Sequence, residues 1–257
     1  MPDDIAADAP AQDRPTPAGR PSPDGSPSPA ERPSPAESPS PAAPPSFADG
    51  YVGDPAVRAE WDALYSERER LWSGQPNGAL VAEVADLSPG RVLDVGCGEG
   101  ADAIWLARSG WDVTALEVSG VALRRAAAHA RDAGAEVRWV HAGLTDAALP
   151  PASFDLVSAQ YPALLRTPGA TAEHALLAAV APGGVLLLVH HAHMDEHHAA
   201  QDSAFDPADY VMPSTVAALL GDDWRVEVDE ERPRVIPEGG AGAHHHHDVV
   251  LRARRLR

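Results

Sequence analysis

Short apolar segments alternate with longer amphipathic ones along the chain from about Trp61 onward. The run 91–95 is short and β-branched, as is typical of a buried parallel strand, and 101–109 has apolar residues at helical spacing. Repetition of this pattern predicts an α/β fold in which helices cover both faces of a parallel sheet. The strands are expected at 91–95, 112–116, 136–141, 154–159 and 185–190.

The pattern changes near the end of the chain, where two strand-like runs, 224–229 and 247–255, follow each other without a helix between them. Two strands joined by a loop rich in Gly, Pro and His form a hairpin. The last strand is therefore expected to run antiparallel to the others. The sequence predicts a doubly wound, mostly parallel sheet of seven strands with an antiparallel last strand.

The N-terminal segment 1–48 has a different composition, with many Pro, Ser, Ala and Asp residues and only Ile5 and Phe47 as large apolar side chains. Such a segment buries too little apolar surface to offset its ordering entropy, so we expect a disordered tail with polyproline character. It either acts as a spacer or binds a partner that recognises polyproline II helices. The folded domain is predicted to span 49–257.

Charge and composition narrow the class of protein. A net charge of −18 argues against binding to nucleic acid, which requires a basic patch. The chain has no apolar run of the ~20 residues that a membrane span needs, and its start, with Asp3 and Asp4, does not resemble a signal peptide. The single cysteine, Cys97, excludes an internal disulfide and fits a reducing compartment. These features predict a cytoplasmic protein.

The strand 91–95 ends in a glycine-rich turn that reads RVLDVGCGEG. Gly96, Gly98 and Gly100 allow a sharp turn and a close approach of the backbone to a ligand. Their spacing, G-x-G-x-G, differs from the G-x-G-x-x-G of dinucleotide sites. The flanking acids Asp94 and Glu99 would repel a pyrophosphate but suit an ammonium or sulfonium group, and S-adenosylmethionine (SAM) carries both.

A second acid stands at the end of the next predicted strand. Glu117 follows Gly98 by 19 residues, the place at which an acid binds the ribose hydroxyls in such folds. The two acids Asp94 and Glu117 thus cover both ends of a SAM molecule.

At this point the chain resembles the class I SAM-dependent methyltransferases, from about Trp61 to Arg257. LDVGCGEG and VTALEVS resemble the first two motifs of that family, and FDLVSAQY and APGGVLLLV resemble its fourth and fifth strands. WDALYSERERLWSGQPN resembles the lead-in helix and lid of small-molecule methyltransferases of the tellurite-resistance and thiopurine type. The resemblance implies that Trp72, Val118 and Gln160 also bind the cofactor.

One position departs from the family pattern. The resemblance implies an acid after the third strand that accepts from the adenine amino group, but HAGLTD places Gly143 there. We expect the amide of Leu144 to face the adenine and regard Asp146 as a candidate replacement for the missing acid.

Most of the histidines fall into two groups, one near 190–198 and the other at 244–247. If the fold is right, both groups lie at the carboxyl edge of the sheet, where ligands bind. Three interpretations stay open. The histidines supply polar groups to the substrate, with His191 or His193 as a general base; or they bind a divalent transition metal; or they form a solvated loop. The candidate metal ligands are His191, His193, His245 and His247.

The sequence therefore predicts an enzyme that transfers a methyl group from SAM to a small-molecule acceptor. A hypothesis from another class is a non-catalytic or sensory protein that binds metal through the histidines on the same fold. A nicotinamide-dependent dehydrogenase is disfavoured by the glycine spacing and by Asp94.

Overall fold

A mixed sheet forms the centre of the computed structural model, which describes residues 47, 50–192, 207–235 and 246–257. Its seven strands lie in the order β3-β2-β1-β4-β5-β7-β6 and are parallel except for β7, which pairs antiparallel with β5 and β6. The predicted fold class and antiparallel last strand are thus confirmed. The strands are β1 (Arg91–Val95), β2 (Asp112–Glu117), β3 (Arg138–His141), β4 (Phe154–Gln160), β5 (Val180–His191), β6 (Trp224–Pro233) and β7 (His247–Arg255).

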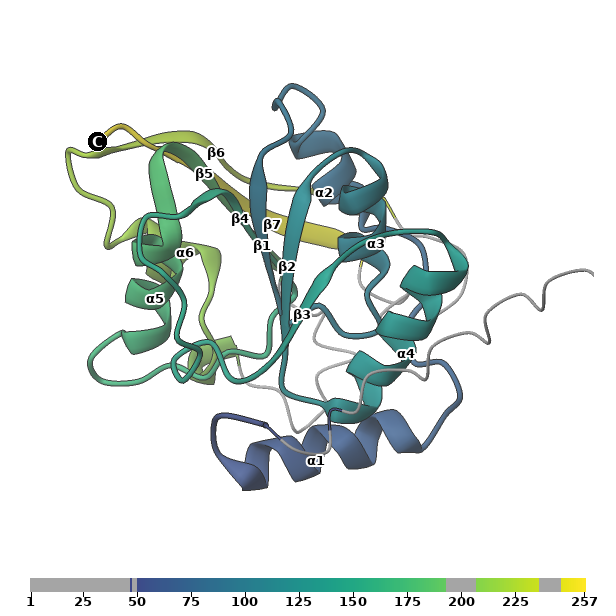
Figure 1. Cartoon of the computed structure of the whole chain (residues 1–257). Helices are drawn as coiled ribbons and strands as arrows, with labels where there is room; N and C mark the ends of the chain where they lie inside the picture. The colour runs from purple at the N-terminus through teal and green to yellow at the C-terminus, as the bar shows by residue number, and fades with distance from the viewer. Residues whose placement is uncertain (1–46, 48–49, 193–206, 236–245) are drawn as a thin grey trace, which may run out of the picture. The chain divides into compact units, whose positions relative to one another are not determined.

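Helices cover both faces of the sheet (Figure 1). Helices α2, α3 and α4 lie on one face and α5 and α6 on the other, while α1 crosses the end of the sheet beside α4. The helices are α1 (Pro55–Ser66), α2 (Gly78–Glu83), α3 (Ala101–Arg108), α4 (Gly120–Asp132), α5 (Thr171–Ala179) and α6 (Pro213–Ala217), with a short 3₁₀ turn at Pro207–Asp209. No helix in the described ranges is long and apolar enough to cross a membrane.

Local sequence signals fix the ends of the two helices nearest the ligand edge. Helix α1 begins with Pro55 after Asp54, whose side chain accepts a hydrogen bond from the amide of Ala56. Helix α4 begins after Ser119, whose hydroxyl accepts from Ala122 and donates to Asp62 of α1 over 2.7 Å. The two helices are therefore joined at the point where β2 ends.

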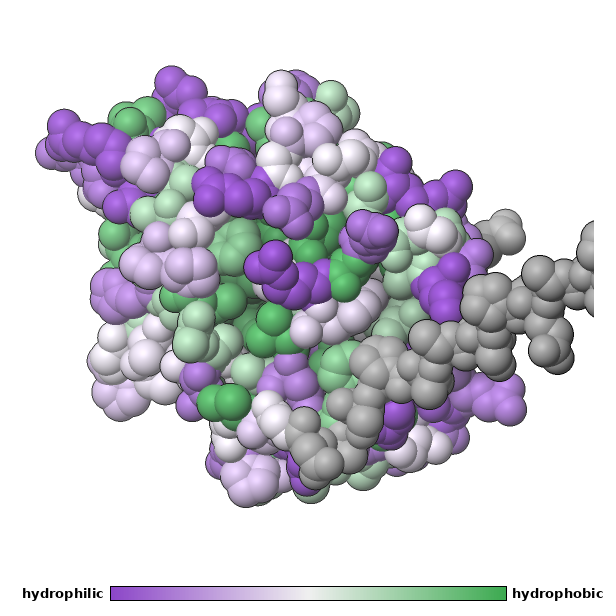
Figure 2. Space-filling model, in the orientation of Figure 1, coloured by the Kyte–Doolittle hydropathy of each residue, from purple (hydrophilic) through white to green (hydrophobic). Residues whose placement is uncertain are grey.

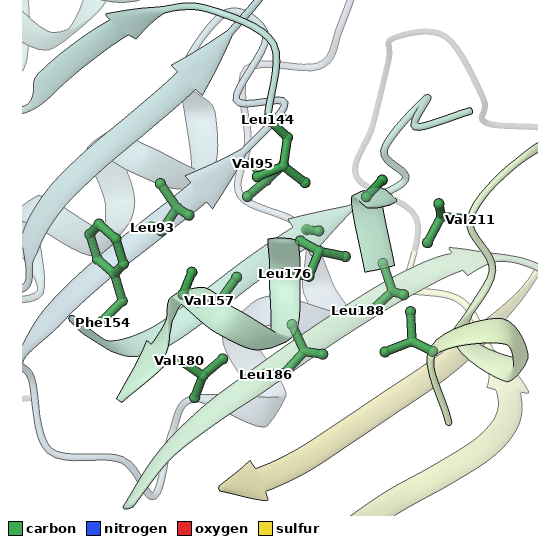
Figure 3. Close-up of a cluster of buried hydrophobic side chains, with 14 of the residues drawn as sticks. Leu93, Val95, Leu144, Phe154, Val157, Leu176, Val180, Leu186, Leu188 and Val211 are labelled. Atoms are coloured by element: carbon green, nitrogen blue, oxygen red, sulfur yellow. The ribbon is translucent and has the colours of Figure 1, made fainter. Parts of the chain in front are cut away.

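The hydrophobic core is divided by the sheet into two clusters. Leu93 and Val95 of β1 belong to a cluster that also includes residues of α5 and α6 (Figure 3), whereas Val92 belongs to the cluster on the opposite face, with residues of α2 and α3. This alternation follows from the two-residue period of a strand. It also turns Asp94 toward the α3 side, beside the glycine turn.

Two strands are longer than the sequence pattern predicts by several residues, whereas β3 begins two residues later than predicted. Strand β5 begins at Val180 rather than at 185, because a register shift opposite Phe154 and Leu156 accommodates the intervening Pro-Gly-Gly turn. Strand β6 continues to Pro233 rather than ending at 229, because the ladder with β7 persists to the pair Pro233 and His247. Residues 230–232 are charged and residue 233 is proline, so this segment lacks the apolar alternation that marks a strand.

An ionic network joins the β6–β7 hairpin to helix α2. Arg252 of β7 is 8% exposed and donates to both carboxylate oxygens of Asp86 over 2.9 Å. It also donates to the carbonyl of Glu83 over 2.8 Å, and its Nε lies 3.0 Å from Glu227 Oε2. One guanidinium thus connects three elements.

The predicted disordered tail lies almost entirely outside the described residues, apart from Phe47. Its disorder and the domain boundary at residue 48 therefore stay predictions.

Candidate functional site

The glycine turn between β1 and α3 has one packed side and one open side. A Cβ atom at Gly98 would lie 2.8 Å from Tyr65 Oη and 3.3 Å from Trp72 Nε1, and φ there is 53°. A Cβ atom at Gly96, where φ is 72°, would meet nothing within 4 Å. Gly98 is therefore required by packing and by backbone conformation, whereas Gly96 faces open space that a ligand can enter.

The third glycine of the turn has a packing role. A Cβ atom at Gly100 would lie 2.9 Å from Ala126 Cβ and 2.9 Å from Trp139 Cη2. Gly100 thus lets α3 begin close to α4. The role of Gly100 in cofactor binding stays a prediction.

Asp94, the last acid of β1, is buried without full compensation. It is 2% exposed, and its Oδ2 has no hydrogen-bond partner among the described residues. Burial raises the pKa of Asp94 well above its usual range, and the nearby carboxylates of Asp102 and Glu117 raise it further. Asp102 itself is engaged, because it accepts from both the amide and the side chain of Asn77 over 2.7 Å. Asp94 is therefore a buried acid without a counter-charge among the described residues, and a cationic ligand group would supply one.

Glu117, at the carboxyl end of β2, is buried and shapes the turn. Its Oε2 accepts from the amide of Gly98 over 3.0 Å, and its Oε1 accepts from the amide of Ser119 over 2.8 Å. Burial nevertheless raises the pKa of Glu117. A carboxylate offers about four lone-pair sites, so two amide donors leave acceptor capacity for a ligand hydroxyl.

Glu99 has a role that the sequence did not predict. Instead of facing a ligand, its buried carboxylate accepts from the amides of Leu71 and Trp72 over 3.1 and 3.0 Å, and from Arg125 Nη1 over 2.9 Å. The indole of Trp72 in turn donates to Tyr65 Oη over 3.0 Å. Glu99 thereby holds the segment before α2 against Gly98, and this contact puts Trp72 beside the turn. The role of Trp72 in cofactor binding stays a prediction.

The end of β3 forms another side of the site. His141 Nε2 lies 3.0 Å from the carbonyl of Val118, and the residue after His141 pairs with Val52. A Cβ atom at Gly143 would lie 2.7 Å from Asp146 Oδ2. The Asp146 carboxylate therefore occupies the space in which a side chain at residue 143 would begin. Leu144 is 6% exposed and packs in the core.

Gln160 and Tyr161 lie at the carboxyl end of β4. The Gln160 amide donates to Ser158 Oγ over 3.1 Å, while its Oε1 is buried without a partner in the described part of the chain. Tyr161 adopts a left-handed φ of 52°, which is uncommon for a bulky residue and often marks a functional site. Its hydroxyl donates to Asp248 over 2.9 Å.

The described members of the two histidine groups lie at one edge of the sheet, as the topology predicts. His191 of β5 pairs with Asp248 of β7, and the amide of Ala192 donates to the carbonyl of His247 over 3.0 Å. The His191 ring stacks on Tyr161 at a centroid distance of 4.3 Å. Several members lie outside the described residues, namely His193, His197, His198, His244 and His245.

The metal interpretation gains no support from the described ranges, which hold no group of three His, Cys, Asp or Glu residues arranged to bind a metal ion. The ring nitrogen Nδ1 of His191 instead lies 3.2 Å from Arg234 Nη1. A guanidinium at this distance competes with a metal cation for the nitrogen lone pair.

His190 is a buried neutral residue, and this makes stability depend on pH. It is 2% exposed, its Nδ1 accepts from the amide of His191 over 2.9 Å, and burial lowers its pKa to about 4. Because the folded pKa lies below the unfolded value of about 6.5, its contribution is complete above pH 6.5 and is lost as the pH falls to 4, about 3 kcal/mol in all.

We expect this loss to disappear in His190→Asn, whose side-chain oxygen can still accept from the His191 amide. Urea unfolding from pH 7.5 to 4 measures the difference, and His174→Asn, an exposed position on α5, serves as the control. A gap between wild type and His190→Asn that stays constant with pH would contradict the assignment.

The known proteins that this chain resembles are described as methyltransferases in several comparisons. A sequence model described as a methyltransferase domain matches residues 92–184. Uncharacterized methyltransferases of Mycobacterium bovis and Mycobacterium tuberculosis are 40% identical over 111 residues, which cover 43% of this chain and 55% of theirs. The chain thus spans about half the length of the curated relatives it matches.

Solved structures extend the likeness beyond that segment. A structure concerned with the conversion of a disulfide bond into a thioacetal group during echinomycin biosynthesis is 27% identical, with a TM-score of 0.60 over 77% of this chain and 92% of that one. A SAM-dependent methyltransferase from Methanosarcina mazei (18% identical; TM-score 0.54; 68% of this chain, 97% of that one) and TehB from Haemophilus influenzae (14%; 0.53; 76% and 66%) share the fold.

Proposed function

Because this chain carries a class I SAM-dependent methyltransferase domain, we propose that it transfers a methyl group from SAM to a small-molecule acceptor. The observation that carries the proposal is the buried carboxylate of Asp94, which has an unpartnered oxygen and lies beside the open face of Gly96. The ammonium group of SAM supplies the cation that this carboxylate lacks.

The other cofactor contacts follow from the same placement. Gly96 and Gly98 provide backbone at the methionine end, and Glu117 uses its remaining lone pairs to accept from the ribose hydroxyls. Trp72 covers the turn, and the unpartnered Oε1 of Gln160 lies at the end of the neighbouring strand β4. Val118, Leu144 and Asp146 form the adenine side.

Bound SAM supplies an electrophilic methyl group on a sulfonium. The remaining task of the protein is to orient the acceptor for in-line attack and to exclude water. Tyr161 and His191 occupy the carboxyl edge next to the cofactor residues, so we assign them to the acceptor side, as we do His193. Figure 2 shows one face of the molecule, on which hydrophobic residues lie in a hollow between more hydrophilic margins.

The acceptor class has one indication among the relatives. The structure that is 27% identical concerns a disulfide that becomes a thioacetal. A sulfur-bearing small molecule is therefore our first candidate acceptor, whereas the likeness to TehB supports only the fold.

Isothermal titration with SAM and with S-adenosylhomocysteine (SAH) tests the proposed cofactor. We expect micromolar binding of both, with NAD as the control ligand that does not bind. Binding of NAD in preference to SAM, or no binding of SAM and SAH, would refute the proposal.

Asp146 is expected to give the site its preference for adenine. It fills the space next to Gly143, and a carboxylate accepts from an amino group but not from a carbonyl oxygen. Wild type should bind SAH about 10-fold more tightly than S-inosylhomocysteine, in which a carbonyl replaces the amino group, and Asp146→Ala should bind the two equally. Asp112→Ala, an exposed acid at the start of β2, is the control and should keep the preference. An unchanged preference in Asp146→Ala would exclude this role.

A further inference from the structure

The segment 67–77, between α1 and α2, lies against the glycine turn and forms neither a helix nor a strand. Residues 67–70 are exposed, and Leu71 is the one buried residue of the segment. Parts of a protein with few buried contacts open at a low cost in free energy. The position of this segment therefore depends on the polar contacts that join it to the rest of the domain.

Several of these contacts converge on Glu99 of the glycine turn. The residues that make them, which we call the Glu99 cluster, are Tyr65, Leu71, Trp72, Glu99 and Arg125. The side chain of Glu99 is 4% exposed, and its carboxylate accepts from the amides of Leu71 and Trp72 over 3.1 and 3.0 Å. Arg125 of α4 donates through Nη1 to this carboxylate over 2.9 Å and through Nη2 to the carbonyl of Arg68 over 2.7 Å. One carboxylate and one guanidinium thus join the segment to the domain.

Helix α4 also fixes the backbone of Glu99. His129 Nδ1 lies 3.3 Å from the carbonyl of Glu99. His129 and Arg125 are four residues apart, so they lie on the same face of α4. This face therefore contacts both the carbonyl and the carboxylate of Glu99. The glycine turn and α4 form the fixed side of the Glu99 cluster, and the segment 67–72 forms the side that can move.

Trp72 is the part of the moving side that borders the proposed cofactor space. Its Nε1 donates to Tyr65 Oη over 3.0 Å and lies 3.3 Å from the position of a Cβ atom at Gly98. Its side chain is nevertheless partly open to solvent, because the residue is 38% exposed. Gly96, two residues earlier in the turn, borders open space. The indole therefore lies at the rim of the space that a ligand of the glycine turn enters.

The contact between the segment and the turn depends on the negative charge of Glu99. Two amides and a guanidinium donate to one buried carboxylate, and hydrogen bonds of this charged kind are stronger than neutral ones. Replacing the carboxylate by an amide leaves one of these donors facing another donor. The loss is expected to exceed that of a neutral hydrogen bond.

We propose that Glu99 is a positioning residue that holds Trp72 over the bound cofactor, and that SAM and SAH leave the site only after the segment 67–72 separates from the Glu99 carboxylate. This inference rests on the proposed function. Glu99 acts through Trp72, since its own hydrogen bonds are directed at the protein. Opening of such a segment and release of product limit the turnover of many enzymes, so the Glu99 cluster would set how long SAH stays bound.

Exchange NMR of SAM labelled with ¹³C in its methyl group, free and bound to the full chain, measures the rate of dissociation. We expect dissociation about 10-fold faster in Glu99→Gln, in Arg125→Met and in Trp72→Leu than in wild type. Two exposed positions provide matched controls that should dissociate at the wild-type rate. They are Glu69→Gln, in the same segment, and Arg124→Met, on the same helix.

A double variant separates positioning through Trp72 from a general distortion of the glycine turn. If Glu99 acts through Trp72, adding Glu99→Gln to Trp72→Leu should change the dissociation rate by less than about 2-fold. Independent effects would multiply to about 100-fold. That outcome would overturn the inference, because it would show that Glu99 acts on the cofactor by another route.

The indole N–H of Trp72 gives a measurement that does not depend on the cofactor. Its signal in ¹H–¹⁵N spectra of the ligand-free chain is identified by its loss in Trp72→Leu. We expect this proton to exchange with water about 10-fold faster in Glu99→Gln and in Arg125→Met, because its hydrogen bond to Tyr65 opens more often when the segment is released. An exchange rate equal to that of wild type in both variants would contradict the inference.

The failure of this inference can be told apart from the failure of the proposed function. Wild-type protein that binds SAM, together with unchanged dissociation in Glu99→Gln, Arg125→Met and Trp72→Leu, would refute the inference and leave the function intact. A wild-type protein that binds neither SAM nor SAH would refute the function itself.

Discussion

Replacing Asp94 by asparagine is expected to weaken SAM binding by about 100-fold, equivalent to about 3 kcal/mol, the larger of the losses seen when one member of a charged hydrogen bond is removed. The reason is that Asp94 is 2% exposed and has no cation among the described residues. The ammonium of SAM would be its main counter-charge. Isothermal titration of wild type and Asp94→Asn measures the difference.

The same change should leave the ligand-free protein within about 1 kcal/mol of wild type, because asparagine removes a buried charge. A binding defect without a folding defect separates a ligand contact from a structural role. Asp112→Asn, an exposed position at the start of β2, is the control and should alter neither quantity. Equal SAM affinity in wild type and Asp94→Asn would remove the main support for the cofactor site.

The affinity for SAM should also depend on pH through Asp94. Because burial raises its pKa, a proton competes with the cofactor ammonium for the carboxylate at low pH. Affinity is expected to rise with pH until Asp94 is ionised, and Asp94→Asn should lose this rise. Ligand-free stability has the opposite trend, since a raised carboxylate pKa favours the folded state at low pH and this contribution is lost as pH rises through the folded pKa.

Replacing Arg252 by methionine is expected to destabilise the protein by about 2 kcal/mol, the loss typical of removing a hydrogen bond to a charged group. The change removes the donor to the buried carbonyl of Glu83 and leaves the buried carboxylate of Glu83 with fewer partners, whereas the carboxylate of Asp86 is 68% exposed and is solvated by water instead. For a domain of this size the loss corresponds to a decrease in melting temperature of about 4–8 °C. Thermal unfolding measures it.

Arg225→Met is the matched control for this prediction. Arg225 also pairs with Glu227, over 3.0 Å, but its side chain is 60% exposed. An exposed pair contributes about 0–1 kcal/mol, so the control should change the melting temperature little. Similar effects of the two substitutions would show that the buried network contributes no more than an exposed pair.

The hydrophobic pattern predicts most of the sheet because its central strands are buried on both faces. Strand β1 has the predicted bounds, and β2 and β4 differ by one residue at their ends. The pattern fails where pairing continues without apolar side chains, as at Glu231 and Arg232 of β6. There the backbone hydrogen bonds to β7 and the charged neighbours stabilise the strand. Neither produces a regular alternation of apolar and polar residues in the sequence.

The candidate site was predictable where a residue's role depends on its neighbours in sequence. Asp94, Gly98 and Glu117 lie within one β–α–β unit, and the hydrogen bond from the Gly98 amide to Glu117 joins the glycine turn to the end of β2. Glu99 was misjudged because its partners, Leu71 and Arg125, come from distant segments. The acidic side chain beside the glycine turn predicted a contact with a cationic ligand, but in the structure it pairs with Arg125.

No local sequence pattern predicts the contacts among Tyr161, His191, Arg234 and Asp248. Arg234 lies beyond the predicted end of β6, and its partner Asp248 is distant in sequence from Tyr161. Only the antiparallel insertion of β7 brings Asp248 beside His191. The two histidine groups correctly indicated the carboxyl edge of the sheet. The side chains that contact His191 there were identified only from the structure.

The insertion of β7 also has a consequence for the order of assembly. Strand β7 follows β6 along the chain yet lies between β5 and β6, so β6 has no neighbour in the sheet until β7 has docked. Pairings between distant segments form slowly because loop closure precedes any gain from contacts. The strands that carry the proposed cofactor residues, β1 to β4, pair without β7. During folding the part of the sheet that carries the proposed cofactor residues can therefore form first, and the edge where Tyr161 meets Asp248 is completed only when the hairpin closes.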